Sequence, residues 1–372
     1  MLGLLPARTA TTLWAEVITD DSEGYSVESK AYAMPAEGGK LEPCTIERRE
    51  PGPEDVLVEL MYCGICHTDL IVANNETGGA IYPVVPGHEM VGRIAKTGTA
   101  VEGFQVGDLV GIGCIADSCR TCDACHAGDE HYCDSGFVMT FNAMDSTGAK
   151  TLGGYSSHYT INQRYVLRIP EGLDPAAAAP LLCGGITVYT PLKRYGIASG
   201  KKVGVLGLGG LGHLAIKMAS AMGADTVMLT SSESKAADAE KLGANQVVLT
   251  SDREQLKEHS SSFDLIINTI PGEHDPNPYL GLLGRYGSMC FVGAPQTPLP
   301  IVISGLIVGD KSMSGSFIGG VPGTEEMLQF CAEHGITADI ELIDIAQVND
   351  AWERIERNDV KYRFVIDLAS LG

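Results

Sequence analysis

The sequence lacks long apolar runs and has few positive charges. No stretch of 18 consecutive apolar residues occurs among its 372 residues, so we expect no transmembrane helix. Lysine and arginine number 26 against 47 aspartate and glutamate residues, which gives a formal net charge of −21. This imbalance argues against nucleic acid and against an anionic membrane surface as partners, because both need clustered positive charge.

The sequence also shows no internal repeat, no low-complexity segment and no secretory signal. The apolar residues near its start form a run too short and too interrupted for the core of a signal peptide. We therefore expect a cytoplasmic protein, with residues 1–27 forming an N-terminal extension. The remaining length suffices for two domains with sizeable cores.

Residues 28–182 show short strand patterns and turn signals without long helical periodicity. Strands bounded by glycine or proline are expected over residues 56–62, 91–98, 107–112 and 165–170. Many short strands without long helices predict a compact β-barrel domain.

Beyond residue 182 the pattern changes to strands that alternate with helices. Apolar strands are expected over residues 202–206, 226–230, 246–249, 264–269 and 288–292. This alternation predicts an α/β domain with a doubly wound parallel sheet over residues 183–320. Residues 321–372 are mixed, and their last strand pattern, at 363–368, is expected to return to the first domain.

Four closely spaced cysteines form the most specific motif, C-x2-C-x2-C-x7-C, at Cys119, Cys122, Cys125 and Cys133. Four thiolates at this spacing suit a closed, tetrahedral structural zinc site. A disulfide cluster is the alternative, and a reducing compartment disfavours it. The neighbouring His126 and His131 are expected to be solvated, because four thiolates already satisfy the metal.

A glycine-rich turn follows the strand at 202–206 and precedes a helical pattern. Residues 207–212 match G-x-G-x-x-G in this strand–turn–helix context, which indicates a dinucleotide site more than an ordinary glycine turn. Gly207 permits the tight turn, Gly209 lets the pyrophosphate approach, and Gly212 lets the helix pack closely. The predicted contacts of this motif are Gly207, Leu208, Gly209, Gly210, Leu211 and Gly212.

The end of the second strand of this domain distinguishes NADP from NAD. An NAD site usually has an acidic residue there that binds the ribose hydroxyls. Here the positions hold small hydroxyl residues and a lysine, which suit a 2′-phosphate, at Thr230, Ser231, Ser232 and Lys235. Glu233 either points outward or takes the ribose role, which would favour NAD. The set as a whole favours NADP(H).

Three separated residues suggest a second metal site. Cys66 follows a strand, His88 lies further along the same domain, and Cys183 lies at the junction of the two domains. A catalytic zinc takes three protein ligands and an open fourth position, and two cysteines with one histidine form a known set. Each residue alone is more often part of a core, but together with the other two motifs they favour zinc.

These motifs together resemble the zinc-dependent medium-chain alcohol dehydrogenases, and more narrowly their cinnamyl alcohol dehydrogenase-like branch. The resemblance is carried by residues 62–69, 82–89, 119–133, 181–189, 207–213, 315–320 and 358–365. It implies a GroES-like β-barrel catalytic domain with an inserted Rossmann domain, and a homodimer that forms through the Rossmann sheets.

The resemblance also implies roles for individual residues at the metal. Cys66, His88 and Cys183 would bind the catalytic zinc, with Glu89 as a nearby ligand that exchanges with water. Asp69 would orient His88, because a metal-bound histidine usually donates its other N–H to a partner.

Further roles concern the substrate and the cofactor. The resemblance implies that Thr68 hydrogen-bonds the substrate oxygen and passes its proton toward the cofactor ribose. It places His67 and Arg363 near the pyrophosphate and Thr187 near the nicotinamide.

The expected reaction is zinc-assisted, NADP(H)-dependent interconversion of primary alcohols and aldehydes, with two zinc ions per chain and aldehyde reduction favoured. Reduction of conjugated C=C or C=N bonds is an alternative, and a non-catalytic nucleotide-binding protein is a remote one. Two departures from the family pattern bear on this choice. Ile71 replaces the usual proton-relay histidine, and residues 75–79 lack the usual tryptophan.

Overall fold

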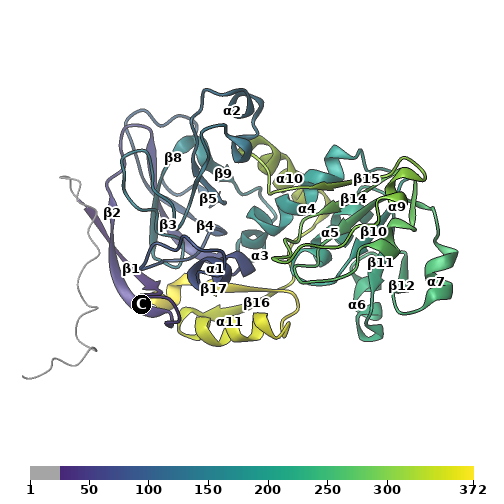
Figure 1. Ribbon diagram of the computed structural model, residues 1–372. Helices are drawn as coiled ribbons and strands as arrows, with labels where there is room; N and C mark the ends of the chain where they lie inside the picture. The colour runs from purple at the N-terminus through teal and green to yellow at the C-terminus, as the bar shows by residue number, and fades with distance from the viewer. Residues whose placement is uncertain (1–25) are drawn as a thin grey trace, which may run out of the picture.

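The computed structural model describes residues 26–372, so nearly all of the extension predicted for residues 1–27 lies outside the described residues. Two lobes lie side by side, and the chain enters the second lobe and then returns to the first (Figure 1). Within residues 26–372, no helix is both long enough and apolar enough to cross a membrane.

The first lobe is built on a seven-stranded sheet in the order β16-β17-β3-β4-β5-β9, with β8 paired to β3. Its strands are β3 (Asp55–Gly64), β4 (Met90–Thr97), β5 (Leu109–Ile112), β8 (His158–Asn162), β9 (Val166–Arg168), β16 (Ile340–Asp344) and β17 (Arg363–Asp367). All neighbours are antiparallel except β16 and β17. The strands expected in this region are therefore present, mostly within two residues of the predicted ends.

Smaller elements complete the first lobe. Two two-stranded sheets are formed by β1 (Ser26–Ala33) with β2 (Glu42–Arg49) and by β6 (Ile115–Asp117) with β7 (Val138–Met139). The helices are α1 (His67–Ala73), α2 (Asp123–Ala127), α3 (Pro175–Ala178) and α11 (Val348–Glu356).

The second lobe is a six-stranded, fully parallel sheet in the order β12-β11-β10-β13-β14-β15. Its strands are β10 (Lys202–Leu206), β11 (Asp225–Thr230), β12 (Gln246–Leu249), β13 (Phe263–Asn268), β14 (Leu283–Phe291) and β15 (Ser312–Gly315). The helices between them are α5 (Gly212–Ala221), α6 (Ala236–Lys241), α7 (Arg253–Glu258), α8 (Asn277–Leu280) and α9 (Ser304–Ile307). The strand order reverses between β10 and β13, and in such sheets ligands bind at the carboxyl ends of the strands at this point.

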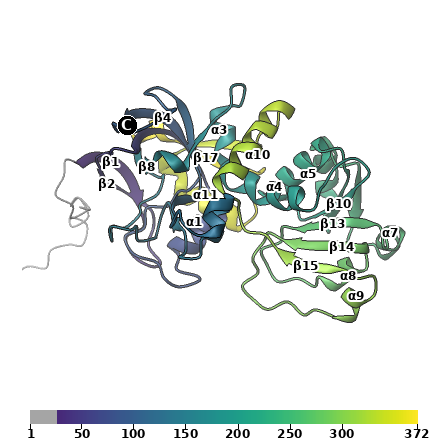
Figure 2. The same cartoon turned by 90° about the horizontal axis from the view of Figure 1, so that it is seen from above.

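Two helices join the lobes. α4 (Gly184–Arg194) and α10 (Val321–His334) pack against each other between the sheets, as the view from above shows (Figure 2). One buried apolar cluster runs continuously from the first sheet through α4 to α5. The expected return of the C-terminal strand is confirmed, because β17 pairs with β3, with Val365 opposite Gly64. This shared core places the ends of several chain segments at the junction of the lobes.

Candidate functional site

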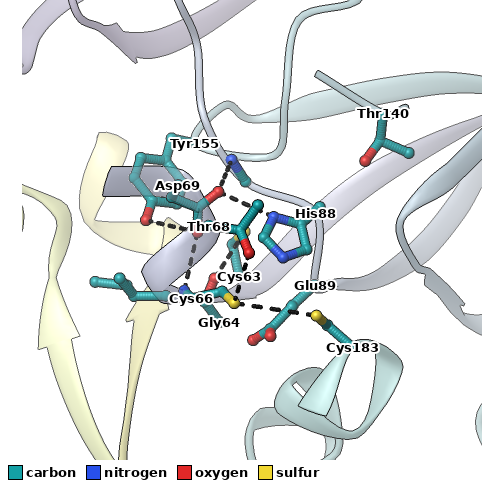
Figure 3. A network of polar contacts seen from close by, with 12 residues as sticks. Cys63, Gly64, Cys66, Thr68, Asp69, His88, Glu89, Thr140, Tyr155 and Cys183 are labelled. Carbon is teal, nitrogen blue, oxygen red and sulfur yellow. Dashed lines mark hydrogen bonds and ion pairs between the residues drawn. The ribbon is translucent and has the colours of Figure 1, made fainter. Parts of the chain in front are cut away.

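Four potential metal-binding side chains converge at the junction of the lobes (Figure 3). They are Cys66, His88, Glu89 and Cys183, whose ligand atoms all lie within 4.8 Å of one another; we refer to them as the junction cluster. Cys66 lies immediately before α1, His88 and Glu89 immediately before β4, and Cys183 at the start of α4. Three distant segments therefore supply the cluster.

A buried carboxylate holds two residues of the cluster in place through hydrogen bonds. Asp69 is 0% exposed, and its Oδ1 lies 3.0 Å from Nδ1 of His88 and accepts from the Gly87 amide at 3.0 Å. Its Oδ2 accepts from the Cys66 amide at 2.9 Å and from the Tyr155 hydroxyl at 3.4 Å. Asp69 therefore fixes both the imidazole and the loop that carries the first thiol (Figure 3).

The other ring nitrogen of His88 is the best indication of a missing partner. Its Nε2 is buried and has no hydrogen-bond partner among the described residues. Nδ1 meets Asp69, so Nε2 is the nitrogen that faces the two thiols and offers its lone pair to a metal when the imidazole is neutral. Phe141 stacks on the outer face of the ring at 5.5 Å and 9°, so the imidazole cannot easily turn away. A buried, unpaired acceptor in this position fits a metal ion.

The two thiols of the cluster have suitable spacing and charge. Their sulfur atoms lie 4.0 Å apart, and a tetrahedral zinc with bonds of about 2.3 Å would hold its sulfurs roughly 3.8 Å apart. Hydrogen bonding from Cys183 lowers the pKa of Cys66 well below its usual value. This shift favours the thiolate, the form that binds metals. The donor set of the junction cluster fits zinc.

Glu89 is held in a buried ion pair at the edge of the cluster. It is 0% exposed, and Nη2 of Arg363 donates to its two oxygens at 2.6 and 2.7 Å and to the Ile65 carbonyl at 2.9 Å. Burial raises the pKa of Glu89 to about 7, against the opposing charge of Arg363. A Cβ atom placed on Gly210 would lie 2.8 Å from Cδ of Arg363. Arg363 therefore lies between the cluster and the glycine-rich turn.

Three other predicted residues lie around the cluster in different ways. The Thr68 hydroxyl oxygen lies 3.5 Å from Sγ of Cys66 and faces the cluster. The Thr187 hydroxyl is buried and donates to the Cys183 carbonyl at 2.7 Å, within its own helix. His67, the first residue of α1, has an exposed side chain. The structure therefore brings Thr68 to the cluster but leaves His67 in solvent.

The four predicted cysteines of residues 119–133 form a second group, with ligand atoms within 4.8 Å of one another. All four are free thiols, and Sγ of Cys119 lies 3.9 Å from that of Cys125, so they form no disulfide. Backbone amides donate to two of the sulfurs, from Cys122 to Cys119 at 3.4 Å and from Cys119 to Cys133 at 3.3 Å. Hydrogen bonds from Thr121 lower the pKa of Cys119 to about 5. This donor set also fits zinc.

The prediction that His131 is solvated is wrong, whereas His126 is exposed as expected. His131 is 5% exposed, and its ring packs on Tyr132 with centroids 4.0 Å apart. The physical reason is that this segment docks on α10. The buried carboxylate of Glu130 accepts from the Val321 amide at 3.0 Å, at the start of that helix.

The residues of the glycine turn, 207–212, adopt the geometry expected of a dinucleotide site. Gly207 has a φ of 97°, and a Cβ atom on Gly212 would lie only 2.0 Å from the Gly207 carbonyl oxygen. Both positions therefore require glycine. A Cβ atom on Gly209 would meet nothing within 4 Å, so its backbone faces open space. The turn leads into the N-terminus of α5, where backbone amides favour an anion.

The predicted 2′-phosphate residues lie together beside this turn. Thr230 ends β11, and its hydroxyl accepts from the Ser232 amide at 3.1 Å, while Ser231 is exposed. Nζ of Lys235 donates to the Leu208 carbonyl at 3.2 Å. The lysine ammonium is thus held between the end of β11 and the glycine turn.

Sequence reasoning missed two buried polar residues next to the glycine turn. The Asn268 side chain accepts from the Ile270 amide at 3.1 Å and contacts Nε2 of His274 at 2.8 Å. His213, which follows the last glycine of the turn, is 0% exposed. The only signal available was a polar residue in an otherwise apolar pattern, and this alone does not identify a function.

The two departures from the family pattern lie on α1 and in the segment just after it. Ile71 is half-buried on α1. In the segment 75–79, the Glu76 carboxylate accepts from Nε2 of Gln296 at 2.9 Å, and this hydrogen bond links the two lobes.

Comparisons with known proteins agree with this architecture. Residues 52–171 match the alcohol dehydrogenase GroES-like domain, and residues 210–333 match the zinc-binding dehydrogenase domain. The chain belongs to the zinc-binding alcohol dehydrogenases. The predicted combination of a GroES-like domain with a Rossmann domain is thereby confirmed.

Individual members of this family cover almost the whole chain. The aldehyde reductase YahK of Escherichia coli (strain K12) is 52% identical over 89% of this chain and 95% of its own. A cinnamyl alcohol dehydrogenase structure from Sorghum bicolor is 45% identical, with a TM-score of 0.89, over 92% of this chain and 98% of its own. A cinnamyl alcohol dehydrogenase from Helicobacter pylori, solved with NADP(H), is 35% identical, with a TM-score of 0.87, over 93% of this chain and 99% of its own.

Proposed function

We propose that this protein is a zinc-dependent NADP(H) oxidoreductase that interconverts primary alcohols and aldehydes, with aldehyde reduction favoured. The observation that carries the proposal is the orphaned Nε2 of His88, which faces two thiols beside a dinucleotide-binding turn. A non-catalytic nucleotide-binding protein would have no need for this buried donor set.

At the catalytic site, Cys66, His88 and Cys183 hold zinc. When bound, the ion supplies Lewis acidity to a carbonyl or alcohol oxygen, and the cofactor supplies or accepts hydride. Asp69 fixes the proton of His88 on Nδ1, which keeps Nε2 available to the metal. Glu89 is held by Arg363 and serves as a ligand that exchanges with water.

Thr68 handles the proton of the substrate. Its hydroxyl lies 3.5 Å from Sγ of Cys66 and could rotate toward a substrate oxygen bound beside the cluster. In reduction it would donate a proton to the substrate oxygen, and in oxidation it would accept the proton of the alcohol. Ile71 carries no proton, so the onward relay to solvent is impaired, which slows oxidation near neutral pH more than reduction.

The four cysteines of 119–133 hold a second, structural zinc ion. The group is closed by four sulfurs and leaves no open position for a substrate. Its role is to fold this segment and to maintain its docking on α10 through Glu130.

NADP(H) is the preferred cofactor. The 2′-phosphate is bound by the hydroxyls and the lysine ammonium that follow β11, while Glu233 is exposed. The relative solved with NADP(H) supports this choice. The cofactor contacts that we propose are His67, Thr187, Gly207, Leu208, Gly209, Gly210, Leu211, Gly212, Thr230, Ser231, Ser232, Lys235 and Arg363.

The substrates are aromatic or medium-length aliphatic aldehydes. Similar proteins include an aldehyde reductase and cinnamyl alcohol dehydrogenases. Between the lobes, the rings of Phe137 and Phe317 lie 5.9 Å apart and offer an apolar surface. Such a surface favours a substrate with an apolar body and a small polar end.

The active form is a cytoplasmic homodimer that associates through the second lobe. β15 is an edge strand of the parallel sheet. Four apolar side chains near it are 56–73% exposed, namely Val302, Ile303, Ile307 and Val308. An apolar patch beside a sheet edge is suited to a symmetric contact with a second copy.

The test combines metal analysis with steady-state kinetics on the purified protein. We expect two zinc ions per chain, rapid oxidation of NADPH with cinnamaldehyde, cinnamyl alcohol as product, and little activity with NADH. Cys66→Ser is the matched control and should retain the structural zinc while losing turnover. Zinc-loaded protein that converts no aldehyde with either cofactor would contradict the proposal, and a saturated aldehyde product would indicate conjugate reduction.

A further inference from the structure

His213 makes two hydrogen bonds in opposite directions from a fully buried position. Its Nδ1 lies 3.1 Å from the Gly209 carbonyl oxygen in the glycine turn, and its Nε2 lies 3.3 Å from the Asp339 amide. An amide N–H can only donate, so Nε2 must accept. The proton therefore resides on Nδ1, which donates to Gly209. Both bonds exist together only in this neutral tautomer.

The surroundings keep the imidazole neutral. Lys217 of α5 and Arg363 of β17 bring positive charge near the ring, and the Asp339 carboxylate is engaged by Lys217 at 2.6 Å. Tyr362 stacks on the ring at 4.9 Å and 20°. Burial lowers the pKa of His213 to about 3, and the charges of Lys217 and Arg363 add to this effect.

Asp339, the partner of His213, also contacts Arg363, which forms the ion pair with Glu89 of the junction cluster. The Asp339 carbonyl accepts from the amides of Tyr362 and Arg363 at 3.0 and 3.1 Å. The Arg363 side chain then lies over the glycine turn and pairs with Glu89. One imidazole thus links the turn of the second lobe to the returning C-terminal strand of the first.

A space-filling role alone does not explain this arrangement. Burying a polar ring is favourable only if both of its nitrogens are paired. Both nitrogens are paired, and each contacts a different lobe's backbone. His213 therefore connects the glycine turn to the Asp339 segment and restricts the distance between them.

We propose that His213 is a positioning residue that holds the glycine turn at a fixed distance from Arg363 and thereby aligns the cofactor with the metal cluster. This role rests on the proposed NADP(H)-dependent function. It acts on the pyrophosphate and nicotinamide parts of the cofactor, which cross from the turn to the cluster. The 2′-phosphate end, beyond β11, depends on it less, because among the proposed phosphate residues only Lys235 bonds to the turn, at the Leu208 carbonyl.

Two variants distinguish the hydrogen-bonded link made by His213 from the local packing of its ring. His213→Phe keeps a ring against Tyr362 and removes both hydrogen bonds. His213→Asn places an amide where Nδ1 stands, so it keeps the bond to Gly209 but cannot reach Asp339. The readouts are the Kd values of NADPH and of adenosine 2′-monophosphate, the zinc content, and kcat and KM for NADPH and cinnamaldehyde.

We expect both variants to raise the Kd and KM of NADPH about tenfold, which corresponds to about 1.4 kcal/mol. Binding of adenosine 2′-monophosphate, zinc content and the KM of cinnamaldehyde should stay within about twofold of wild type. The effect should not change between pH 5.5 and 8.5, because His213 remains neutral throughout that range. His213→Asn keeps the experiment decisive if His213→Phe does not fold.

Two results would overturn the role of His213 alone. One is NADPH binding by His213→Asn within twofold of wild type, since the link to Asp339 would then be irrelevant. The other is an equal loss of NADPH and adenosine 2′-monophosphate, which indicates general damage. Wild-type protein that binds neither ligand would contradict the proposed function itself and remove the basis of this role.

Discussion

Removing Arg363 should destabilise the protein more than removing any exposed cation. In Arg363→Met the buried carboxylate of Glu89 loses both of its hydrogen bonds, and the Ile65 carbonyl loses its donor. The side chains of Arg363 and Glu89 are 6% and 0% exposed, so water cannot replace the lost partner. Breaking a buried pair in this way costs roughly 3–5 kcal/mol.

A double-mutant cycle measures the pair itself. Urea-induced unfolding, followed by circular dichroism at fixed zinc concentration, gives the free energy of unfolding for Arg363→Met, Glu89→Gln and the double variant. We expect a coupling energy of about 2 kcal/mol or more, because the second substitution removes a charge that the first left unpaired. Lys193→Met is the matched control. Its ion pair with Glu326 has side chains 52% and 54% exposed, so a loss below about 1 kcal/mol is expected.

A buried, charged Arg363–Glu89 pair is contradicted if Arg363→Met costs no more than Lys193→Met, or if the two single effects simply add. Either result would mean that Glu89 finds another partner or is not charged in the folded protein. A loss of NADPH affinity in Arg363→Met, without a change in zinc content, would further place the guanidinium between cofactor and cluster.

Four further outcomes are expected. Lys235→Ala should lower kcat/KM for NADPH by about 10- to 100-fold, the worth of one charged hydrogen bond, and leave NADH unchanged; an equal loss with both cofactors would contradict the 2′-phosphate site. Ile71→His should raise alcohol oxidation near pH 7 by about tenfold, and an unchanged pH–rate profile would disprove the impaired relay. Cys122→Ser should remove one zinc ion per chain and lower Tm while metal at the junction cluster persists, whereas loss of both ions would show that the sites are not independent. In wild type, the pKa of His213 is about 3 in the folded protein and about 6.5 in the unfolded chain. The free energy of unfolding therefore decreases as the pH is lowered below about 6.5, by up to about 1.4 kcal/mol per pH unit. The drop in Tm from pH 7.5 to 5.0 should therefore be smaller in His213→Phe, and an equal drop in both proteins would contradict the buried neutral imidazole.

The two sheets could be predicted from local patterns. Apolar strands that alternate with helices favour a parallel sheet, and each of the strands expected in the second lobe is present. The glycine turn was recognisable because its three glycines occur between a strand and a helix. The four cysteines of 119–133 lie close in sequence, so their grouping in space follows from the chain itself.

Contacts between distant segments could not be obtained in the same way. Cys66 and Cys183 are 117 positions apart, and their grouping rested on the other two motifs and on resemblance to a known family, not on any local pattern. Glu89 and Arg363 are 274 positions apart, and no local pattern indicates that they pair. The error at His131 has the same origin, because the contact of the neighbouring Glu130 with the start of α10 joins distant segments and has no local sequence signal.

His213 shows how a motif can be recognised without its function being understood. The turn at 207–212 predicted cofactor binding from backbone requirements alone. The next residue, His213, accepts a hydrogen bond from the amide of Asp339. Asp339 is 126 positions away and lies immediately before β16 of the other lobe. Only the folded chain reveals which group the second nitrogen meets.

The most direct test of the proposed reaction traces the transferred hydride with deuterium. Zinc-loaded protein is incubated with cinnamaldehyde and NADPH that carries deuterium at the transferable position, and the product is analysed by mass spectrometry and NMR. We expect cinnamyl alcohol with a single deuterium on the former carbonyl carbon, and no labelled product from Cys66→Ser. Deuterium at the far carbon of the double bond, or no transfer from NADPH at all, would contradict it.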